Sequence, residues 1–204
     1  MYAEVTEILT RSYDEGAARS REALGKEPWK VEQRAAFLQA VRAEGARTLL
    51  EVGAGTGIDS AFFAEEGLAV TATDLSPAMV EMCRAKGLDA HVRDVLGLDF
   101  PVASFDAAYS LNCLLHVPNS DLLEALATIA RLLKPGGLFF LGLWGDVDSE
   151  GQSADDNHVP PRFFSFRSPE TLLNAVAERF EVERHTMIEV AAGRTFQALV
   201  LRRR

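Results

Sequence analysis

The sequence predicts an α/β fold in which helices flank a seven-stranded, mostly parallel sheet whose last strand is antiparallel. From about residue 28, short β-rich runs alternate with segments of helical period, which is typical of βαβ units. The run 138–143 is apolar throughout and indicates a strand buried on both faces. The chain ends on two β-rich runs joined by a short glycine-containing turn, which predicts a hairpin and hence an antiparallel last strand.

Each element follows from a local signal. A charged amphipathic helix opens the chain, and the Gly25 to Pro28 break separates it from a second helix. Ser76 and Pro77 are an N-cap and a first-turn proline, and residues 134–137, Lys-Pro-Gly-Gly, end a later helix before the apolar strand. We expect helices at residues 3–20, 28–44, 58–66, 78–86, 120–133 and 169–178. We expect strands at residues 47–52, 69–73, 89–93, 105–111, 138–143, 180–190 and 195–201.

Residues 144–167 form the one long irregular segment in this pattern. Its first half is acidic and rich in turn residues, and its second half is aromatic and basic. A segment of this length without periodicity inside a compact domain is either a functional loop or disordered.

Composition excludes several classes of function. The 204 residues, 48% of them hydrophobic, suffice for one ordinary globular domain. The 21 basic and 30 acidic residues give a net charge of -9, which disfavours nucleic acid and anionic lipid as partners. Cys83 and Cys113 are too few for a disulfide framework, and no cysteine and histidine spacing predicts a metal site. No stretch is long and apolar enough to span a membrane, so we expect a cytoplasmic protein.

The strongest motif is the glycine-rich run at residues 49–60, LLEVGAGTGIDS, between a buried strand and a helix. Glycine there permits positive φ and close approach of a ligand to the backbone. Ile58 stands where the dinucleotide pattern has its third glycine, and the Gly-Lys-Ser/Thr of a phosphate loop is absent. Glu51 would repel a pyrophosphate but suits a cation, so the loop fits the sulfonium and ammonium of S-adenosylmethionine better than NAD.

Two further acids end neighbouring strands. Asp74 lies about 20 residues beyond the loop, at the position from which a carboxylate accepts hydrogen bonds from both ribose hydroxyls of an adenosine. Asp94 follows the third strand, beside the expected adenine pocket, where it can accept from the exocyclic amine. Either acid alone is often a helix cap, but three acids at adjacent strand ends predict an adenosine site.

Five ordered motifs, EVGAGTG, TATDLSPAMVEMCR, RDVLGLDFP, FDAAYSLNCLLHV and LLKPGGLFFLGLW, resemble those of the class I S-adenosylmethionine-dependent methyltransferases. The resemblance covers roughly residues 45–144, and it is strongest to the small bacterial branch that methylates metabolites. It implies a Rossmann-like three-layer sandwich, with S-adenosylmethionine as cofactor and S-adenosylhomocysteine as product.

The resemblance also assigns roles to individual positions. Glu51 would face the methionine moiety, Asp74 would hold the ribose, and the backbone at Leu111 would lie beside the methyl-bearing sulfur. The chain departs from the family at Ser20, where similar chains commonly carry a tyrosine in the first helix, and Tyr13 is the candidate contact from that helix. The remaining cofactor-binding candidates are the loop residues Gly53, Ala54, Gly55, Thr56 and Gly57 and the adenine contacts Leu75, Met79, Asp94 and Val95.

Acceptor and catalytic residues carry weaker signals. His116 lies at the rim beside the expected methyl group, where it is either a general base or a packed core residue or helix-start cap. Within residues 144–167, we expect an acceptor pocket with an aromatic wall and anion-binding arginines, or else aromatic residues that anchor the loop to the core. Asp155 and Asp156 fit a solvated turn better than a metal site. The acceptor candidates are Trp144, His158, Arg162 and Arg167.

These observations predict one methyltransferase domain over residues 1–204. Residues 1–44 would be a helical lid, 45–143 the cofactor-binding core, 144–167 the acceptor loop, and 168–204 the terminal helix and hairpin. The expected reaction is methyl transfer from S-adenosylmethionine to a small-molecule O or N nucleophile, by a monomer or homodimer. The alternatives are a protein methyltransferase that receives a basic partner on its acidic loop, a non-catalytic S-adenosylmethionine-binding subunit, and an NAD-linked oxidoreductase.

Overall fold

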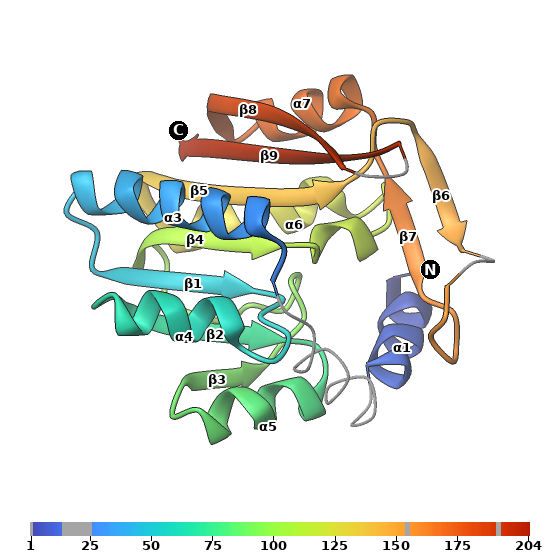
Figure 1. Cartoon of the computed structure of the whole chain (residues 1–204), viewed down its shortest axis with the longest axis horizontal. Helices are drawn as coiled ribbons and strands as arrows, with labels where there is room; N and C mark the ends of the chain where they lie inside the picture. The colour runs from blue at the N-terminus through green and yellow to red at the C-terminus, as the bar shows by residue number, and fades with distance from the viewer. Residues whose placement is uncertain (1, 14–25, 154–155, 191–192) are drawn as a thin grey trace.

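The computed structural model describes residues 2–13, 26–153, 156–190 and 193–204. Its main sheet has seven strands in the order β3-β2-β1-β4-β5-β9-β8 (Figure 1). Strands β1 to β5 are parallel, and β9 is antiparallel to both β5 and β8, so the predicted mixed sheet is confirmed. The strands are β1 (Thr48–Val52), β2 (Ala69–Asp74), β3 (Asp89–Val92), β4 (Phe105–Leu111), β5 (Leu133–Trp144), β8 (Phe180–Val190) and β9 (Arg194–Arg203).

Helices cover both faces of this sheet because its central strands are apolar on both sides. On one face lie α3 (Pro28–Ala43), α4 (Ile58–Glu65) and α5 (Pro77–Ala85), and on the other lie α6 (Leu122–Leu132) and α7 (Pro169–Ala177) (Figure 1). Successive residues of β1 alternate between the two layers, since Leu49 packs with α3 and Leu50 with α6. Each layer therefore has its own buried cluster.

Two helices begin at a serine cap, and the cap at Ser76 confirms the sequence prediction. Ser76 caps α5 by accepting from the backbone of Met79 at 3.3 Å, with Pro77 in the first turn. Ser168 caps α7 in the same way, by accepting from Thr171 at 3.2 Å. The start of α5 is therefore fixed directly after the acid that ends β2.

Several boundaries differ from the sequence prediction. The first helix, α1 (Tyr2–Ser12), is shorter within the described residues than the 3–20 span that we expected, and the rest of that span lies outside the described residues. Strand β5 begins at Leu133, because residues 134–137 continue the strand instead of forming a separate turn.

The 144–167 segment is also more regular than predicted. It contains a small antiparallel sheet of β6 (Ser149–Gln152) and β7 (Phe163–Phe166), with Gly151 opposite Phe164. A further short 3-10 helix, η1 (Leu114–His116), follows β4. The exposed residues of β6 carry no alternating apolar pattern, so the strand arises from pairing with β7.

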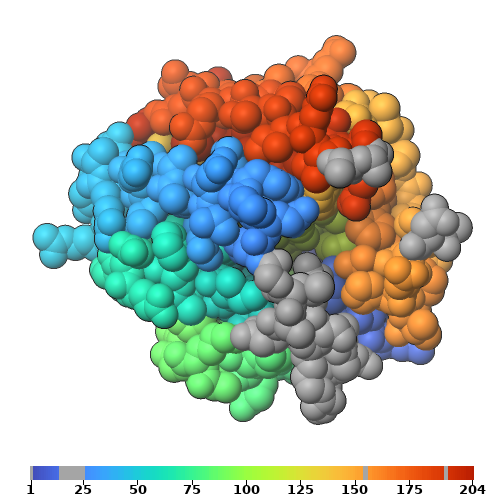
Figure 2. Space-filling view, viewed as in Figure 1, coloured from blue at the N-terminus to red at the C-terminus, as the bar shows by residue number. Residues whose placement is uncertain are grey.

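The carboxyl ends of β1, β2, β3 and β4 meet at one edge of the sheet, and α1 lies across that edge beside β7 (Figure 1). In the space-filling view, the dark blue atoms of α1 lie against the orange atoms of the 144–167 segment (Figure 2). Ser12 Oγ donates to the Pro160 carbonyl at 2.6 Å and thereby ties α1 to the 144–167 segment. Within the described ranges, no helix is long and apolar enough to cross a membrane. The same residues hold no group of three or more histidine, cysteine, aspartate or glutamate side chains that could bind a metal ion.

Candidate active site

The glycine-rich loop leaves β1 with three residues in the left-handed region: Gly53 has φ +76°, Gly55 has φ +56° and Gly57 has φ +81°. A Cβ at Gly53 would lie 2.3 Å from Cys113 Cβ, so the loop can pass the turn after β4 at this distance only without a side chain. A Cβ at Gly55 would meet open space. The loop therefore presents bare backbone at the carboxyl edge of the sheet.

Asp74 fixes the loop to the end of β2. Its Oδ2 accepts from the Gly55 amide at 2.8 Å and its Oδ1 from the Ser76 amide at 2.9 Å. In addition, the amides of Gly53 and Ala54 donate to the Thr73 carbonyl at 2.8 and 2.9 Å. The carboxylate is thus held in one orientation by backbone donors on either side.

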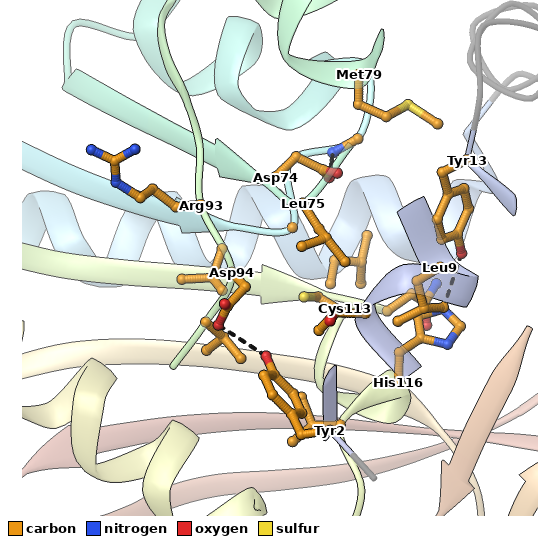
Figure 3. A pocket seen from close by; sticks show the side chains of 18 residues that line it. Tyr2, Leu9, Tyr13, Asp74, Leu75, Met79, Arg93, Asp94, Cys113 and His116 are labelled. Atoms are coloured by element: carbon orange, nitrogen blue, oxygen red, sulfur yellow. Dashed lines mark hydrogen bonds between the residues drawn. The ribbon is translucent and has the colours of Figure 1, made fainter. Parts of the chain in front are cut away.

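Asp94 lies just beyond β3 and accepts three hydrogen bonds on Oδ1. The donors are the Leu96 amide at 2.7 Å, the Gly97 amide at 3.1 Å and the Tyr2 hydroxyl at 3.0 Å (Figure 3). Burial, followed by the charge of Asp94, raises the pKa of Tyr2, so its phenol stays protonated and donates. Tyr2 therefore joins the first turn of α1 to the acid that we predicted beside the adenine.

Glu51 is 2% exposed and accepts a hydrogen bond from Ser60 Oγ. Burial raises its pKa to about 8, and the negative charge of Asp59 adds to the rise, whereas the Ser60 hydrogen bond and the Lys26 charge oppose it. Asp59 is itself paired with Lys26 and, at 2.9 Å, with Arg34 Nη1. In the described part of the chain, the nearby cations Lys26 and Arg34 thus pair with Asp59 and not with the Glu51 carboxyl.

Two cavities meet at this edge and share Gly53, Gly55, Leu111 and Asn112 in their walls. The first cavity, of about 100 Å³, lies between the strand ends and α1 (Figure 3). The second, of about 500 Å³, lies between the glycine-rich loop, the start of α3 and the 144–167 segment.

Most of the sequence-predicted site residues line one of these two cavities. The first has Tyr13, Gly53, Gly55, Asp74, Leu75, Met79, Asp94, Val95, Leu111 and His116 in its wall. The second has Glu51, Gly53, Ala54, Gly55, Thr56, Leu111, His158 and Arg162. Gly57 lines neither cavity, because it packs against Cys83 and Leu88 at the start of α4, where a Cβ would lie 2.8 Å from both side chains.

Arg167 is not brought to the acceptor region that we predicted for it. It is fully buried and donates to the carbonyls of Leu114 at 3.0 Å and Val117 at 2.6 Å and to Asn119 Oδ1 at 2.8 Å. Burial lowers its pKa to about 10, against the charges of Glu150 and Asp148, which raise it. Arg167 therefore fixes the turn that carries η1 and is not a wall residue.

Trp144 also lies outside both cavity walls. At the end of β5 it packs edge-on against Trp29, with ring centroids 5.6 Å apart, and against Phe196 at 5.3 Å. Lys30 and Arg194 lie over its ring at 5.6 and 4.3 Å. Its role in the described structure is to anchor the start of the 144–167 segment.

The acidic residues of that segment are engaged within the chain. Asp146 accepts from Thr195 at 2.9 Å, and Asp148 accepts from the Ser168 amide and hydroxyl, both at 2.9 Å. Asp156 is paired with Arg162, so our expectation of a solvated turn at Asp156 is wrong, while Asp155 lies outside the described residues. This arrangement disfavours the acidic loop as a docking site for a basic partner.

Sequence reasoning missed several wall residues. Tyr2, Thr6 and Leu9 reach the first cavity from one side of α1, and their i, i+4 and i, i+3 spacing is the signal that could have grouped them. Asn112 lines both cavities with φ +57°, and its Oδ1 is buried without a hydrogen-bond partner among the described residues. A non-glycine residue in that conformation, directly after a strand, is a recognised sign of a functional turn.

Residues 49–137 match the family model described as a methyltransferase domain. Over 108 residues the chain is 40% identical to a ubiquinone biosynthesis O-methyltransferase of Xanthomonas oryzae pv. oryzae, covering 48% of this chain and 42% of that protein. It is 33% identical over 130 residues to a cypemycin N-terminal methyltransferase of a Streptomyces species, covering 61% and 53%. The matches span about half the length of these curated relatives.

Among solved structures, the fold is similar to that of the 1,6-didemethyltoxoflavin-N1-methyltransferase of Burkholderia thailandensis, which was determined with its substrate and S-adenosylhomocysteine. The TM-score is 0.75 at 24% identity, and the alignment covers 100% of this chain and 90% of the other. The motif order, the seven-stranded sheet with its antiparallel last strand and the family match agree. Residues 49–137 are therefore similar to a methyltransferase domain, and the whole chain has the fold of a class I methyltransferase.

Proposed function

We propose that this protein binds S-adenosylmethionine and transfers its methyl group to an O or N nucleophile of a small molecule. The observation that carries the proposal is the joined pair of cavities at the sheet edge, bounded by the glycine-rich loop and by the carboxylates of Glu51, Asp74 and Asp94. These acids lie at or just beyond the carboxyl ends of three adjacent parallel strands, at the edge where open α/β sheets bind their ligands.

The residues present fit the cofactor. The bare backbone at Gly55 leaves open space beside the loop, and Asn112 Oδ1 offers a buried acceptor that has no partner among the described residues. Asp74 would hold the ribose, Asp94 and the Val95 amide the adenine edge, and Glu51 the ammonium of the methionine moiety. Leu75 and Met79 would pack on the adenine, with Leu111 beside the sulfur.

S-adenosylmethionine supplies a methyl group bonded to a sulfonium, from which a neutral thioether leaves readily. The protein therefore mainly has to orient the nucleophile. The wall of the first cavity is largely apolar side chains under α1, which excludes water from the reacting atoms. His116 is the candidate general base for acceptors that must lose a proton, since it lines this cavity and is 8% exposed. His158 and Arg162 would contact the acceptor from the second cavity.

We assign the four parts of the chain the following roles in the proposed methyl transfer. Residues 1–44 act as a lid through α1, residues 45–143 hold the cofactor, residues 144–167 form the acceptor loop, and residues 168–204 complete the sheet. The hydrogen bond from Ser12 to Pro160 supports a lid and a loop that work as one cover over the site.

A peptide amine is the second candidate acceptor. It is favoured by the similarity to a protein named as an N-terminal methyltransferase of cypemycin, whereas the O-methyltransferase relatives favour a hydroxyl of a small molecule. A non-catalytic subunit that holds the cofactor is the third alternative, because the described residues of the two cavities would also suit a protein that binds S-adenosylmethionine without transferring its methyl group.

The test is incubation of the purified protein with S-adenosylmethionine and three kinds of acceptor: polyhydroxylated phenols, N-heterocycles and short peptides with a free amino terminus. Mass spectrometry then detects S-adenosylhomocysteine and an acceptor heavier by one methyl group. We expect a methylated small molecule, which the Asp74→Ala variant forms far more slowly. A methylated peptide alone would favour the second candidate, and cofactor binding without any product would favour the non-catalytic one.

A further inference from the structure

A chain of hydrogen bonds joins α1, η1 and the 144–167 segment beside the first cavity. His116 Nδ1 lies 2.7 Å from the Phe163 carbonyl oxygen, and its Nε2 lies 3.0 Å from the Tyr13 hydroxyl (Figure 3). A carbonyl oxygen can only accept, so Nδ1 carries a proton and donates it to Phe163. In the neutral imidazole, Nε2 is then the acceptor for the Tyr13 hydroxyl.

Arg162 fixes the direction of the phenol proton. Its Nη1 donates to Tyr13 Oη at 2.8 Å, and because a guanidinium only donates, the phenol oxygen accepts this bond and directs its own proton to His116. Asp156 holds Arg162 in place through a two-point contact of 2.9 and 2.6 Å and also accepts from its backbone amide at 2.7 Å. Burial acts to raise the pKa of Asp156, but the bonds from Arg162 keep it well below its usual range.

The phenol is held at the junction of the two cavities. Tyr13 and His116 line the first cavity, while Arg162 and His158 line the second. The backbone carbonyl of Tyr13 accepts from Ser76 Oγ at 2.6 Å, which anchors the end of α1 to the start of α5. Among the described residues, the charged or titratable groups that face the phenol are His116 on η1 and His158 and Arg162 on the 144–167 segment, with Asp156 behind Arg162.

We propose that Tyr13 is a catalytic residue that takes the acceptor's proton and passes its own to His116, with Arg162 as a positioning residue. This inference rests on the proposed methyl transfer. The acceptor O–H or N–H bond breaks and its proton moves to Tyr13 Oη, while the Tyr13 proton moves to His116 Nε2 and yields an imidazolium. The electron pair left on the acceptor forms the bond to the methyl carbon, and the pair of the carbon–sulfur bond stays on sulfur. The imidazolium later releases its proton to water.

The relay defines a chemical class of acceptor. A neutral amine already presents a lone pair and can attack without prior loss of a proton, so it has no use for a base. A phenol, an enol or the N–H of a lactam or N-heterocycle must lose its proton as the new bond forms. The geometry therefore assigns to this site a neutral acceptor with a weakly acidic O–H or N–H group.

The first experiment reads the proton arrangement without any acceptor. The whole protein, labelled with ¹⁵N in its four histidines, is studied by NMR at neutral pH, alone and with S-adenosylhomocysteine, and His116→Gln assigns the signals. The relay requires the neutral His116 ring to carry its proton on Nδ1 in either state. A proton on Nε2 would overturn the proposal, because Tyr13 could not then donate to that atom.

The second experiment measures kcat against pH for an acceptor found in the panel above. Tyr13→Phe should lower kcat by about 10²-fold or more and remove the acidic limb of the profile, where protonation of His116 stops the relay; His116→Gln should remove the same limb. Arg162→Met should resemble Tyr13→Phe, and Arg162→Lys should restore part of the rate because it keeps a donor to the phenol.

Two matched variants serve as controls. Tyr2→Phe removes a hydroxyl from the same helix at its bond to Asp94, so it should raise the KM for S-adenosylmethionine without changing the pH profile of kcat. His185→Gln, on β8, removes a histidine outside both cavity walls and should leave the rate unchanged. Tyr13→Phe with wild-type kcat and pH profile would overturn the relay. Failure of the wild type to bind S-adenosylhomocysteine would instead refute the proposed function, while the histidine measurement on the free protein would still test the proton arrangement.

Discussion

Cofactor binding should release a proton from Glu51. The pKa of this carboxyl is raised to about 8 by burial and by the charge of Asp59. At pH 7 about nine tenths of the molecules therefore carry the proton, and an ammonium group placed beside Glu51 favours its loss. The affinity for S-adenosylhomocysteine should rise about tenfold between pH 6 and pH 7 and level off above pH 8.

Calorimetry in buffers of different ionisation enthalpy measures that proton directly. The wild type should release close to one proton per S-adenosylhomocysteine at pH 7. Glu51→Gln should bind more weakly and without this release, because the amide imitates the protonated acid. Glu65→Gln, the same change on an exposed residue at the end of α4, should behave as the wild type.

The stability of the free protein should depend on pH in the opposite direction to its affinity for S-adenosylhomocysteine. The folded state binds the Glu51 proton more tightly than the unfolded state, so the free energy of unfolding falls as pH rises from about 4.5 to 8. The contribution is at most about 1.4 kcal/mol per pH unit. Glu51→Gln should thus be more stable than the wild type at pH 8 while it binds the ligand less well. Binding heats that do not depend on the buffer, or a Gln variant with wild-type affinity, would refute the placement of the ammonium at Glu51.

Three further changes test the scaffold of the site by chemical denaturation. Gly53→Ala should lower the free energy of unfolding by about 2–4 kcal/mol, because the new Cβ would lie 2.3 Å from Cys113 Cβ. Gly55→Ala, with open space at its Cβ, should lower it by only about 1 kcal/mol through backbone strain. Equal losses would contradict the close approach at Gly53. Arg167→Met should lose about 3–5 kcal/mol because buried carbonyls lose their donor, and a neutral effect would mean that they find other partners. Burial acts to raise the pKa of Asp106, but hydrogen bonds from Lys134 and from the amides of Arg47 and Thr48 hold it below the usual range. The contribution of Asp106 to stability is therefore lost as pH falls below about 4. Asp106→Asn should weaken the dependence of the unfolding free energy on pH in this acid range, and an unchanged dependence would refute the reasoning.

The sequence predicted that the glycine-rich loop and Asp74 lie together, because the determinants of this arrangement are local. The glycines at residues 53–57 follow β1 directly, and Asp74 ends the next strand, so pattern and spacing suffice to bring them together. The same holds for the Ser76 cap of α5. The positions of the glycine-rich loop, the end of β2 and the start of α5 could therefore be predicted from the sequence.

The contacts that α1 makes at the site join distant residues. Tyr13 meets His116 across 103 positions and Arg162 across 149, and the bond between Tyr2 and Asp94 spans 92. No periodicity in the sequence encodes such pairs, because they result from α1 lying across the sheet edge.

Arg167 shows the reverse case. An arginine near a predicted acceptor loop suggests an anion site, since arginine is rarely fully buried. Here Arg167 donates from inside the core to the carbonyls of Leu114 and Val117 in the η1 turn and to that of Ser165 on β7, which calls for a donor with several N–H groups. That demand arises only once the turn is folded, so the sequence alone could not reveal it.

Calorimetric titration of the whole protein with S-adenosylhomocysteine, and separately with NAD, tests the central claim most directly. The account predicts micromolar or tighter binding of S-adenosylhomocysteine and no comparable binding of NAD. The Asp74→Ala variant should lose about 10²-fold or more in affinity, since two charge-assisted hydrogen bonds to the ribose disappear. Preference for NAD, or no binding of S-adenosylhomocysteine, would contradict the assignment of these cavities to S-adenosylmethionine.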